Sequence, residues 1–118
     1  MNYPNNQPSV RVRKVNRLIQ EELGKIVNEE IDFPSGILAT IVGVETSIDI
    51  KHAKIRISVM PRSKTGTVLE ILEKNVFFLQ RALNKKLVMR FVPQIRFVVD
   101  TVQDKLERVE ELLRQAKT

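Results

Sequence analysis

The sequence predicts an α+β fold in which a three-stranded sheet carries helices on one face. Apolar and polar residues alternate over 53–59 and again over 95–99, which is the pattern of strands with one buried and one exposed side. The segments around them repeat apolar residues at helical spacing. Because an isolated two-stranded ribbon is marginally stable in water, these strands need a third strand and a layer of helices. The expected order is helix, strand, strand, helix with a possible break, strand, helix.

The chain is expected to begin with a disordered tail over residues 1–8, which contain two prolines, three asparagines and a glutamine. Ser9 is suited to cap a first helix that runs to about Glu30. Pro34 and Gly36 then end this helix and turn the chain into the first strand. One face of the helix is predicted to be apolar and consists of Val15, Leu18, Ile19, Leu23 and Ile26.

Two antiparallel strands are predicted within residues 40–60. The first is centred on the β-branched run 41–44, and the second on 53–59, with Asp49 in the connecting turn. Pro93 opens the third strand, in which apolar side chains alternate over 95–99. These strands are expected to pair in one sheet.

The middle helix is predicted to follow a loop over 61–67, because Thr67 and Glu70 have the spacing of a capping box. Phe77 and Phe78 fall off its apolar face. Three interpretations follow: a bend near Asn75 changes the phase of the helix, one ring is exposed, or both rings pack in the core. The apolar face itself contains Leu69, Leu72, Val76, Leu79 and Leu83.

A last helix is predicted after the third strand. Thr101 and Asp104 suit its start. Its apolar stripe is narrow and consists of Leu106, Val109, Leu112 and Leu113.

Composition argues for one domain over residues 9–118 and against an enzyme. The chain has 118 residues and 42% of them are hydrophobic, enough for one core. It lacks cysteine, which excludes thiol catalysis and is compatible with the cytoplasm. His52 is the single histidine, and no metal-binding or phosphate-loop spacing accompanies it. We therefore expect no catalytic residue, cofactor or metal, and no membrane span.

Basic residues carry the functional signal, since the formal net charge is +6. They gather at the start of the first helix, before the middle helix, along it and around the third strand, whereas acidic residues concentrate elsewhere. This division suits a phosphate backbone on one side of the molecule. An exposed Phe77 could stack on an unpaired base. The candidate RNA-binding residues are Arg11, Arg13, Lys14, Arg17, Arg62, Lys64, Lys74, Phe77, Arg81, Lys85 and Arg90.

Three segments of the chain resemble the ribosome-binding factor A family. They are VRKVNRLIQEEL over 12–23, VETSIDIKHAKI over 44–55 and RFVPQIRFVVD over 90–100. The patterns VExSxDIxxAKI and RxVPxIxFxxD are each moderately specific, and their order and spacing span nearly the whole chain.

The resemblance implies a type II KH-like fold and a role in ribosome assembly. Members of the family bind the immature small ribosomal subunit and its 16S-type rRNA near the neck and decoding region, and support late maturation of the RNA ends, particularly in the cold. They are cytoplasmic, and we expect a monomer. The family usually has an Ala-x-Gly kink between its two middle helices, where this chain has Asn75, Val76 and Phe77. We therefore predict ordinary helical angles at Phe77 and a break at Asn75 or Val76.

Two other functions remain open from the sequence. One is a general binder of single-stranded RNA that uses a KH-like groove, although the Gly-x-x-Gly clamp of that class is absent. The other is a protein-interaction module that docks a partner on the open face of the sheet. Copurification with small ribosomal subunits separates the first hypothesis from both.

Overall fold

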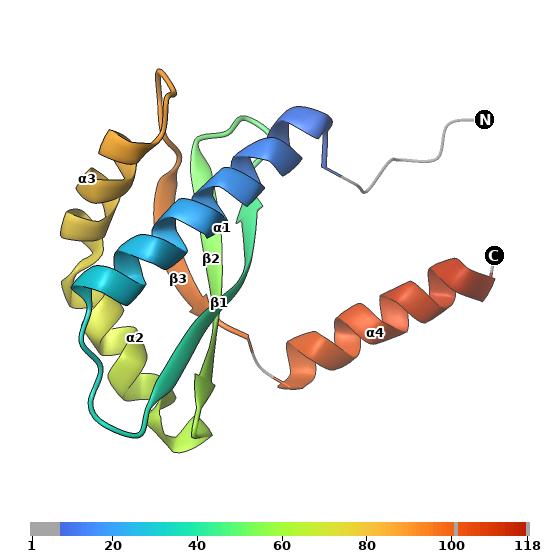
Figure 1. The fold of residues 1–118 in the computed structure, drawn as a ribbon. Coiled ribbons are helices and arrows are strands. Elements are labelled where there is room, and N and C mark those ends of the chain that lie inside the picture. The colour runs from blue at the N-terminus through green and yellow to red at the C-terminus, as the bar shows by residue number, and fades with distance from the viewer. Residues whose placement is uncertain (1–7, 101, 118) are drawn as a thin grey trace.

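The computed structural model describes residues 8–100 and 102–117, so the predicted disordered tail lies outside the described residues apart from Pro8. The predicted order is confirmed, and the middle helix is divided in two (Figure 1). The elements are α1 (Val10–Glu30), β1 (Leu38–Thr46), β2 (His52–Met60), the short 3₁₀ helix η1 (Arg62–Lys64), α2 (Thr65–Lys74), α3 (Val76–Lys86), β3 (Gln94–Val99) and α4 (Val102–Lys117).

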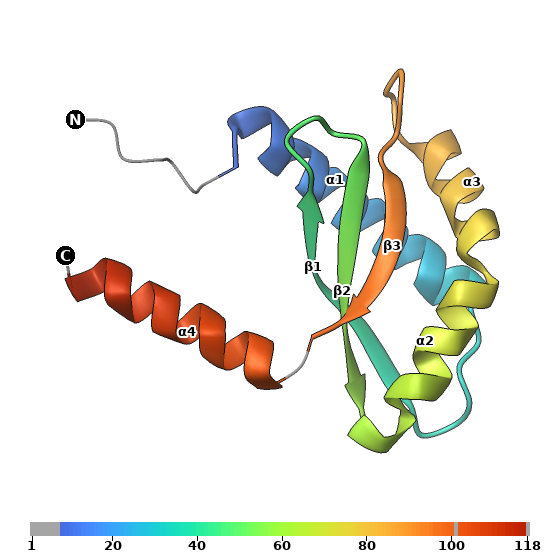
Figure 2. The same ribbon diagram turned by 180° about the vertical axis from the view of Figure 1, so that it is seen from behind.

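The three strands form one sheet, as predicted, and their order in the sheet is β1-β2-β3. β1 and β2 are antiparallel, with a bulge between Ile41 and Gly43. β2 and β3 are parallel, so the chain between them must cross over the sheet, and α2 and α3 make this crossover. Helices α1, α2 and α3 lie on one face, while Figure 2 shows the opposite face of the sheet without a covering helix.

The core lies between this sheet and the three helices. Its fully buried side chains include Ile19 and Leu23 from α1, Ile55 from β2, and Leu79 and Leu83 from α3. The alternation in β2 is confirmed, because Ala53, Ile55, Ile57 and Val59 are buried and the residues between them are not.

The apolar patterns of the sequence predict that Leu18, Ile26, Ile57, Leu79 and Phe97 are buried. Four of these five are buried, namely Ile26, Ile57, Leu79 and Phe97. Leu18 was predicted wrongly, since it is 44% exposed. At about 100° per residue, Leu18 lies roughly 110° from the centre of the buried face of α1. It therefore borders the apolar stripe rather than belonging to it.

Capping of α1 matches the prediction, whereas the start of α2 does not. The Val12 N–H donates to the Ser9 hydroxyl oxygen over 3.2 Å. The segment 61–67 is not a loop, because η1 leads directly into α2 at Thr65. The Thr65 hydroxyl donates to the Arg62 carbonyl over 2.7 Å and secures this entry. Thr67 consequently lies inside the helix and caps nothing.

The break between α2 and α3 falls at Asn75, as predicted. Asn75 has φ −104° and ψ 9°, and its side-chain amide donates to the Ile71 carbonyl over 2.8 Å. Phe77 keeps helical angles within α3, because Ile50 is the one non-glycine residue with positive φ in the described part of the chain. Phe77 is 83% exposed and Phe78 is 42% exposed, so the interpretation that both rings pack in the core is wrong.

Side-chain amides from the helices cap both edges of the sheet. On β1, the Thr46 N–H donates to Asn16 Oδ1 over 2.8 Å, and Gln20 Nε2 lies 3.5 Å from the Ile41 carbonyl. On β3, the Ile95 N–H donates to Gln80 Oε1 over 2.8 Å. Exposed strand edges are a route to aggregation, and these caps leave fewer backbone groups available to another strand.

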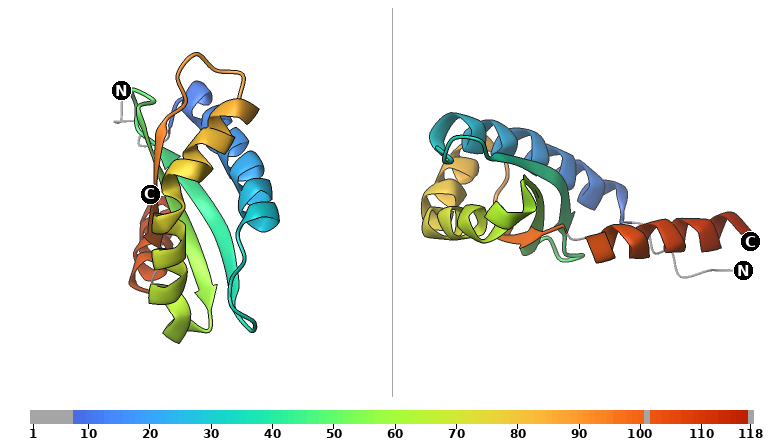
Figure 3. Two further views of the ribbon diagram at one scale, coloured as in Figure 1. Left: turned by 90° about the vertical axis from the view of Figure 1, so that its left-hand side faces the viewer. Right: turned by 90° about the horizontal axis from the view of Figure 1, so that it is seen from below.

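The last helix stands apart from the core. Figure 3 shows α4 leading away from the sheet and the other helices. Its predicted start at Thr101 lies outside the described residues, and α4 begins at Val102. The side chains of its apolar stripe are all more than half exposed, and they are Leu106, Val109, Leu112 and Leu113.

Candidate nucleic-acid interface

The cations of α1 divide between two faces. Arg13 and Arg17 are four residues apart and exposed; Arg17 lies opposite the buried stripe, whereas Arg13 lies near its border. Arg17 Nε makes an ion pair of 3.2 Å with Glu21, and because both side chains are exposed this pair contributes little stability. Lys14 is also exposed. Arg11 lies on the flank of the helix, toward the turn between β1 and β2.

The cations around the middle helices are all exposed, but they do not form one continuous helical stripe. Lys74 ends α2, where it pairs with Glu70 over 3.2 Å. Arg81 and Lys85 belong to α3, on the other side of the break at Asn75. Helical spacing therefore relates Arg81 to Lys85 only. The two remaining candidates, Arg62 and Lys64, lie in η1 before α2.

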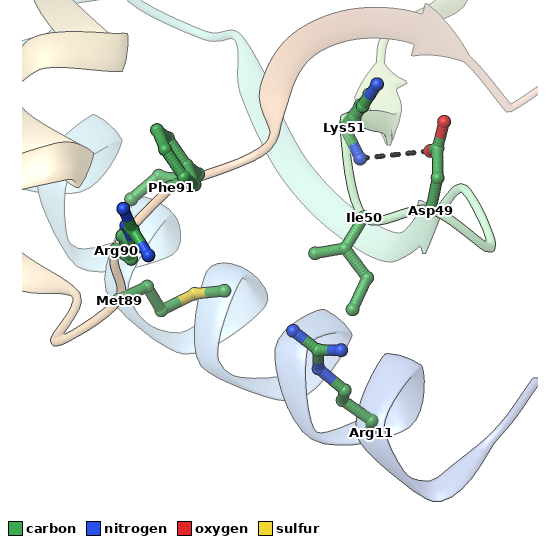
Figure 4. A pocket seen from close by; sticks show the side chains of 8 residues that line it. Arg11, Asp49, Ile50, Lys51, Met89, Arg90 and Phe91 are labelled. Carbon is green, nitrogen blue, oxygen red and sulfur yellow. Dashed lines mark hydrogen bonds between the residues drawn. The ribbon is translucent and has the colours of Figure 1, made fainter.

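One hollow brings together two predicted residues that are far apart in the sequence. Arg11 and Arg90 both line it, and it has a volume of about 700 Å³ (Figure 4). We call it the loop-end hollow, because it lies between the start of α1, the β1–β2 turn and the loop from α3 to β3. The residues that line it are Arg11, Asp49, Ile50, Lys51, Met89, Arg90, Phe91 and Val92.

The β1–β2 turn forms one wall of the loop-end hollow and is held by its own hydrogen bonds. The Asp49 carboxylate accepts from the Ser47 hydroxyl over 2.6 Å and from the Lys51 N–H over 3.1 Å. The Ser47 hydroxyl, followed by the Lys51 N–H, holds the pKa of Asp49 below its ordinary value. Ile50 has φ 60°, a conformation that costs a β-branched residue about 1–3 kcal/mol. The turn is therefore fixed in one strained shape.

The α3–β3 loop forms the opposite wall and is anchored at both ends. Leu87 at its start and Pro93 at its end are buried. Gln80 Nε2 donates to the Pro93 carbonyl over 3.1 Å. Between these anchors, the Phe91 ring is 75% exposed, and Arg90 Cζ lies 5.4 Å from its centroid. The loop thus presents an aromatic ring with a guanidinium group over it.

A second hollow of about 430 Å³ lies between α3 and β3. Phe77 and Arg96 both line it, together with Glu73 and Gln80. Lys74 and Arg81 are not among the lining residues, so the structure does not bring them to this hollow with Phe77. The Phe77 ring is exposed here, as stacking on a base requires.

The open face of the sheet carries cations that the candidate set did not include. Lys54 lies between Glu45 on β1 and Arg96 on β3 in the strand register. Arg56 lies over Gly43, and its Nη1 is 3.7 Å from a Glu45 carboxylate oxygen. The alternation of apolar and polar residues in β2 and β3 already indicates that Lys54, Arg56 and Arg96 share one face of the sheet.

No group of three or more histidine, cysteine, aspartate and glutamate side chains in the described residues is arranged to hold a metal ion. His52 is exposed at the first position of β2. No helix in this part of the chain is long and apolar enough to cross a membrane. What the surface offers is positive charge beside exposed aromatic rings, which is the chemistry of RNA binding.

Known proteins match this chain over most of its length. The family model of ribosome-binding factor A matches residues 11–113. Ribosome-binding factor A of Roseiflexus castenholzii is 40% identical over 111 residues, which cover 92% of this chain and 85% of the relative.

A solved structure and a fitted homology model show the same fold at low sequence identity. The crystal structure of ribosome-binding factor A from Thermus thermophilus has a TM-score of 0.66 at 18% identity, and the match covers 75% of this chain and 94% of that one. A homology model of the Thermus thermophilus factor, fitted into an electron cryo-microscopy map of its 30S complex, has a TM-score of 0.61 at 22% identity, with 70% of this chain and 88% of that one covered.

Proposed function

This chain belongs to the ribosome-binding factor A family, and we propose that it binds the small ribosomal subunit through contacts to 16S-type rRNA. The observation that carries the proposal is the exposed basic face of α1 together with the loop-end hollow. Arg13, Lys14 and Arg17 are exposed on α1, and Arg11 joins Arg90 at the hollow. The relative from Thermus thermophilus, described in complex with the 30S subunit, supports this choice of partner.

The protein acts in this proposal by binding and not by catalysis. Contacts to phosphates hold a rigid domain on the RNA and carry charge rather than sequence information. A ligand that binds one RNA conformation better than another shifts the population toward it. We propose that the protein stabilises an immature conformation of the subunit in the cytoplasm, supports late maturation of the 16S rRNA ends, and leaves when maturation removes that conformation.

Sucrose-gradient sedimentation of a lysate tests the proposal. The protein should travel with free small subunits and be depleted from large subunits and complete ribosomes. Cells without the protein should accumulate 16S rRNA with unprocessed ends, and more so at low temperature. A protein that remains at the top of the gradient at low salt, with mature rRNA ends in its absence, would contradict the proposed function.

A further inference from the structure

We propose that the loop-end hollow holds one unpaired RNA nucleotide, with its base against the Phe91 ring and its phosphate near Arg11 and Arg90. This inference rests on the proposed function and names the ligand of one part of the surface. The hollow of about 700 Å³ falls within the range of about 300–1,000 Å³ that is usual for sites that enclose a small ligand.

The charge of the hollow favours a phosphate. Three cations and one carboxylate line it, and that carboxylate, Asp49, already accepts from the Ser47 hydroxyl and the Lys51 N–H. Within the described residues Arg11, Lys51 and Arg90 make no ion pair, whereas Arg17, Arg56 and Lys74 each have an acidic partner. The cations of the hollow therefore remain available to a bound anion, unlike several others on the surface.

The apolar part of the hollow favours a base over an inorganic anion. Ile50 and Met89 extend toward each other from the turn and the loop, with the Arg11 guanidinium close to Ile50 (Figure 4). Phe91 keeps three quarters of its surface exposed although the Arg90 guanidinium lies over its ring. A free phosphate would use the cations alone, whereas a nucleotide covers the cations and the apolar surface together.

The walls are fixed before any ligand arrives. Two backbone hydrogen bonds close the turn. The Ser47 N–H donates to the His52 carbonyl over 2.8 Å, and the Ile50 N–H donates to the Ser47 carbonyl over 2.9 Å. The loop is tied to α3 through Gln80 and the Pro93 carbonyl. Binding then orders few groups, so little affinity is lost to conformational entropy. Because each of the four bases offers a π face to the Phe91 ring, we expect weak selectivity among them.

Substitution of Phe91 tests the proposal on isolated small subunits and on protein-free 16S rRNA. Phe91→Ala should weaken binding to both by roughly 5- to 150-fold, the range for the loss of one base–aromatic stack. The dependence on salt should stay unchanged, because no phosphate contact is lost. Phe91→Tyr should restore most of the affinity, and Phe91→Leu, which keeps apolar surface without a π face, should not.

Substitution of the cations of the hollow, unlike substitution of Phe91, should change the salt dependence of binding. Arg11→Ala/Arg90→Ala should flatten the plot of log affinity against log salt by about 0.7, because the two cations together neutralise one phosphate of a single strand. Val88→Ala is the matched control, because Val88 is an exposed apolar side chain of the same loop that does not line the hollow. Thermal melts of all variants report whether the domain is folded.

The outcomes separate this inference from the proposed function. If the wild-type protein binds neither subunits nor rRNA, the proposed function fails. If the wild type binds and Phe91→Ala binds equally well, the nucleotide site is wrong while the function stands. If Phe91→Ala weakens binding to subunits but not to protein-free rRNA, the ring contacts a ribosomal protein, which also overturns the nucleotide site.

Discussion

Gln80 holds the edge of β3, and its replacement should destabilise the fold measurably. Its amide accepts from the Ile95 N–H over 2.8 Å and donates to the Pro93 carbonyl over 3.1 Å. Ile95 is 4% exposed and Pro93 is below 2%, so both backbone groups lie in largely buried residues. A buried polar group left without a partner costs about 1–3 kcal/mol. Gln80→Met keeps the length of the side chain and removes both bonds, and should lower the free energy of unfolding by about 2–4 kcal/mol.

Urea denaturation followed by circular dichroism at 25 °C measures this change. The midpoint should fall while the slope m stays constant, since the surface exposed on unfolding is the same. Asn84→Ala is the matched control, because Gln80 Nε2 also donates to Asn84 Oδ1 over 3.0 Å on the exposed side. It should cost less than about 0.5 kcal/mol. A Gln80→Met protein within about 0.5 kcal/mol of wild type would refute the reasoning, because the edge groups would then have other partners.

Three further changes test local features of the fold by thermal melts. Gly24→Ala should stabilise the protein by about 0.5–1 kcal/mol, because Gly24 lies inside α1 and a Cβ there meets no atom within 4 Å. Gly36→Ala should destabilise it by about 1–2 kcal/mol, because Gly36 has φ +85°. Asp49→Asn should lower the melting temperature near neutral pH. The hydrogen bonds of the turn stabilise only the ionised carboxylate, and they lower the folded-state pKa of Asp49 for that reason. The difference in melting temperature should therefore begin to shrink as pH falls below about 3.9, the pKa of an unfolded aspartate, and disappear as pH falls through the lowered folded-state pKa. An Asp49→Asn difference that grows in acid would contradict this sign.

The strands and the core were predictable because their signal is local and periodic. Alternation over 53–59 fixed which face of β2 is buried, and the apolar spacing of α1 identified Ile19, Leu23 and Ile26 as core residues. Leu18 was predicted wrongly because spacing defines a face only to within one position at its border. The start of α2 was misplaced because the capping-box spacing of Thr67 and Glu70 also occurs inside a helix.

The functional surface was predicted only in part, because its residues meet through the fold. Arg11, Lys51 and Arg90 come from three separate segments, and no local pattern relates them. Phe91 is not in the candidate set from the sequence, because no local pattern relates it to Arg11 and Lys51. Nothing in the sequence indicates the left-handed conformation of Ile50, since β-branched residues rarely adopt it. Alternation alone predicts that one face of the sheet carries Lys54, Arg56 and Arg96.

The salt dependence of binding to isolated small subunits tests the central claim most directly. About six phosphate contacts should give a slope of log affinity against log salt near −4 to −5. Arg13→Ala/Arg17→Ala should weaken binding and flatten that slope by about one to two, with an unchanged thermal melt, because both side chains are exposed and outside the core. Glu21→Ala removes the partner of Arg17 and should not flatten the slope. A folded double variant that keeps the wild-type affinity and slope would exclude this face of α1 from the RNA-binding surface.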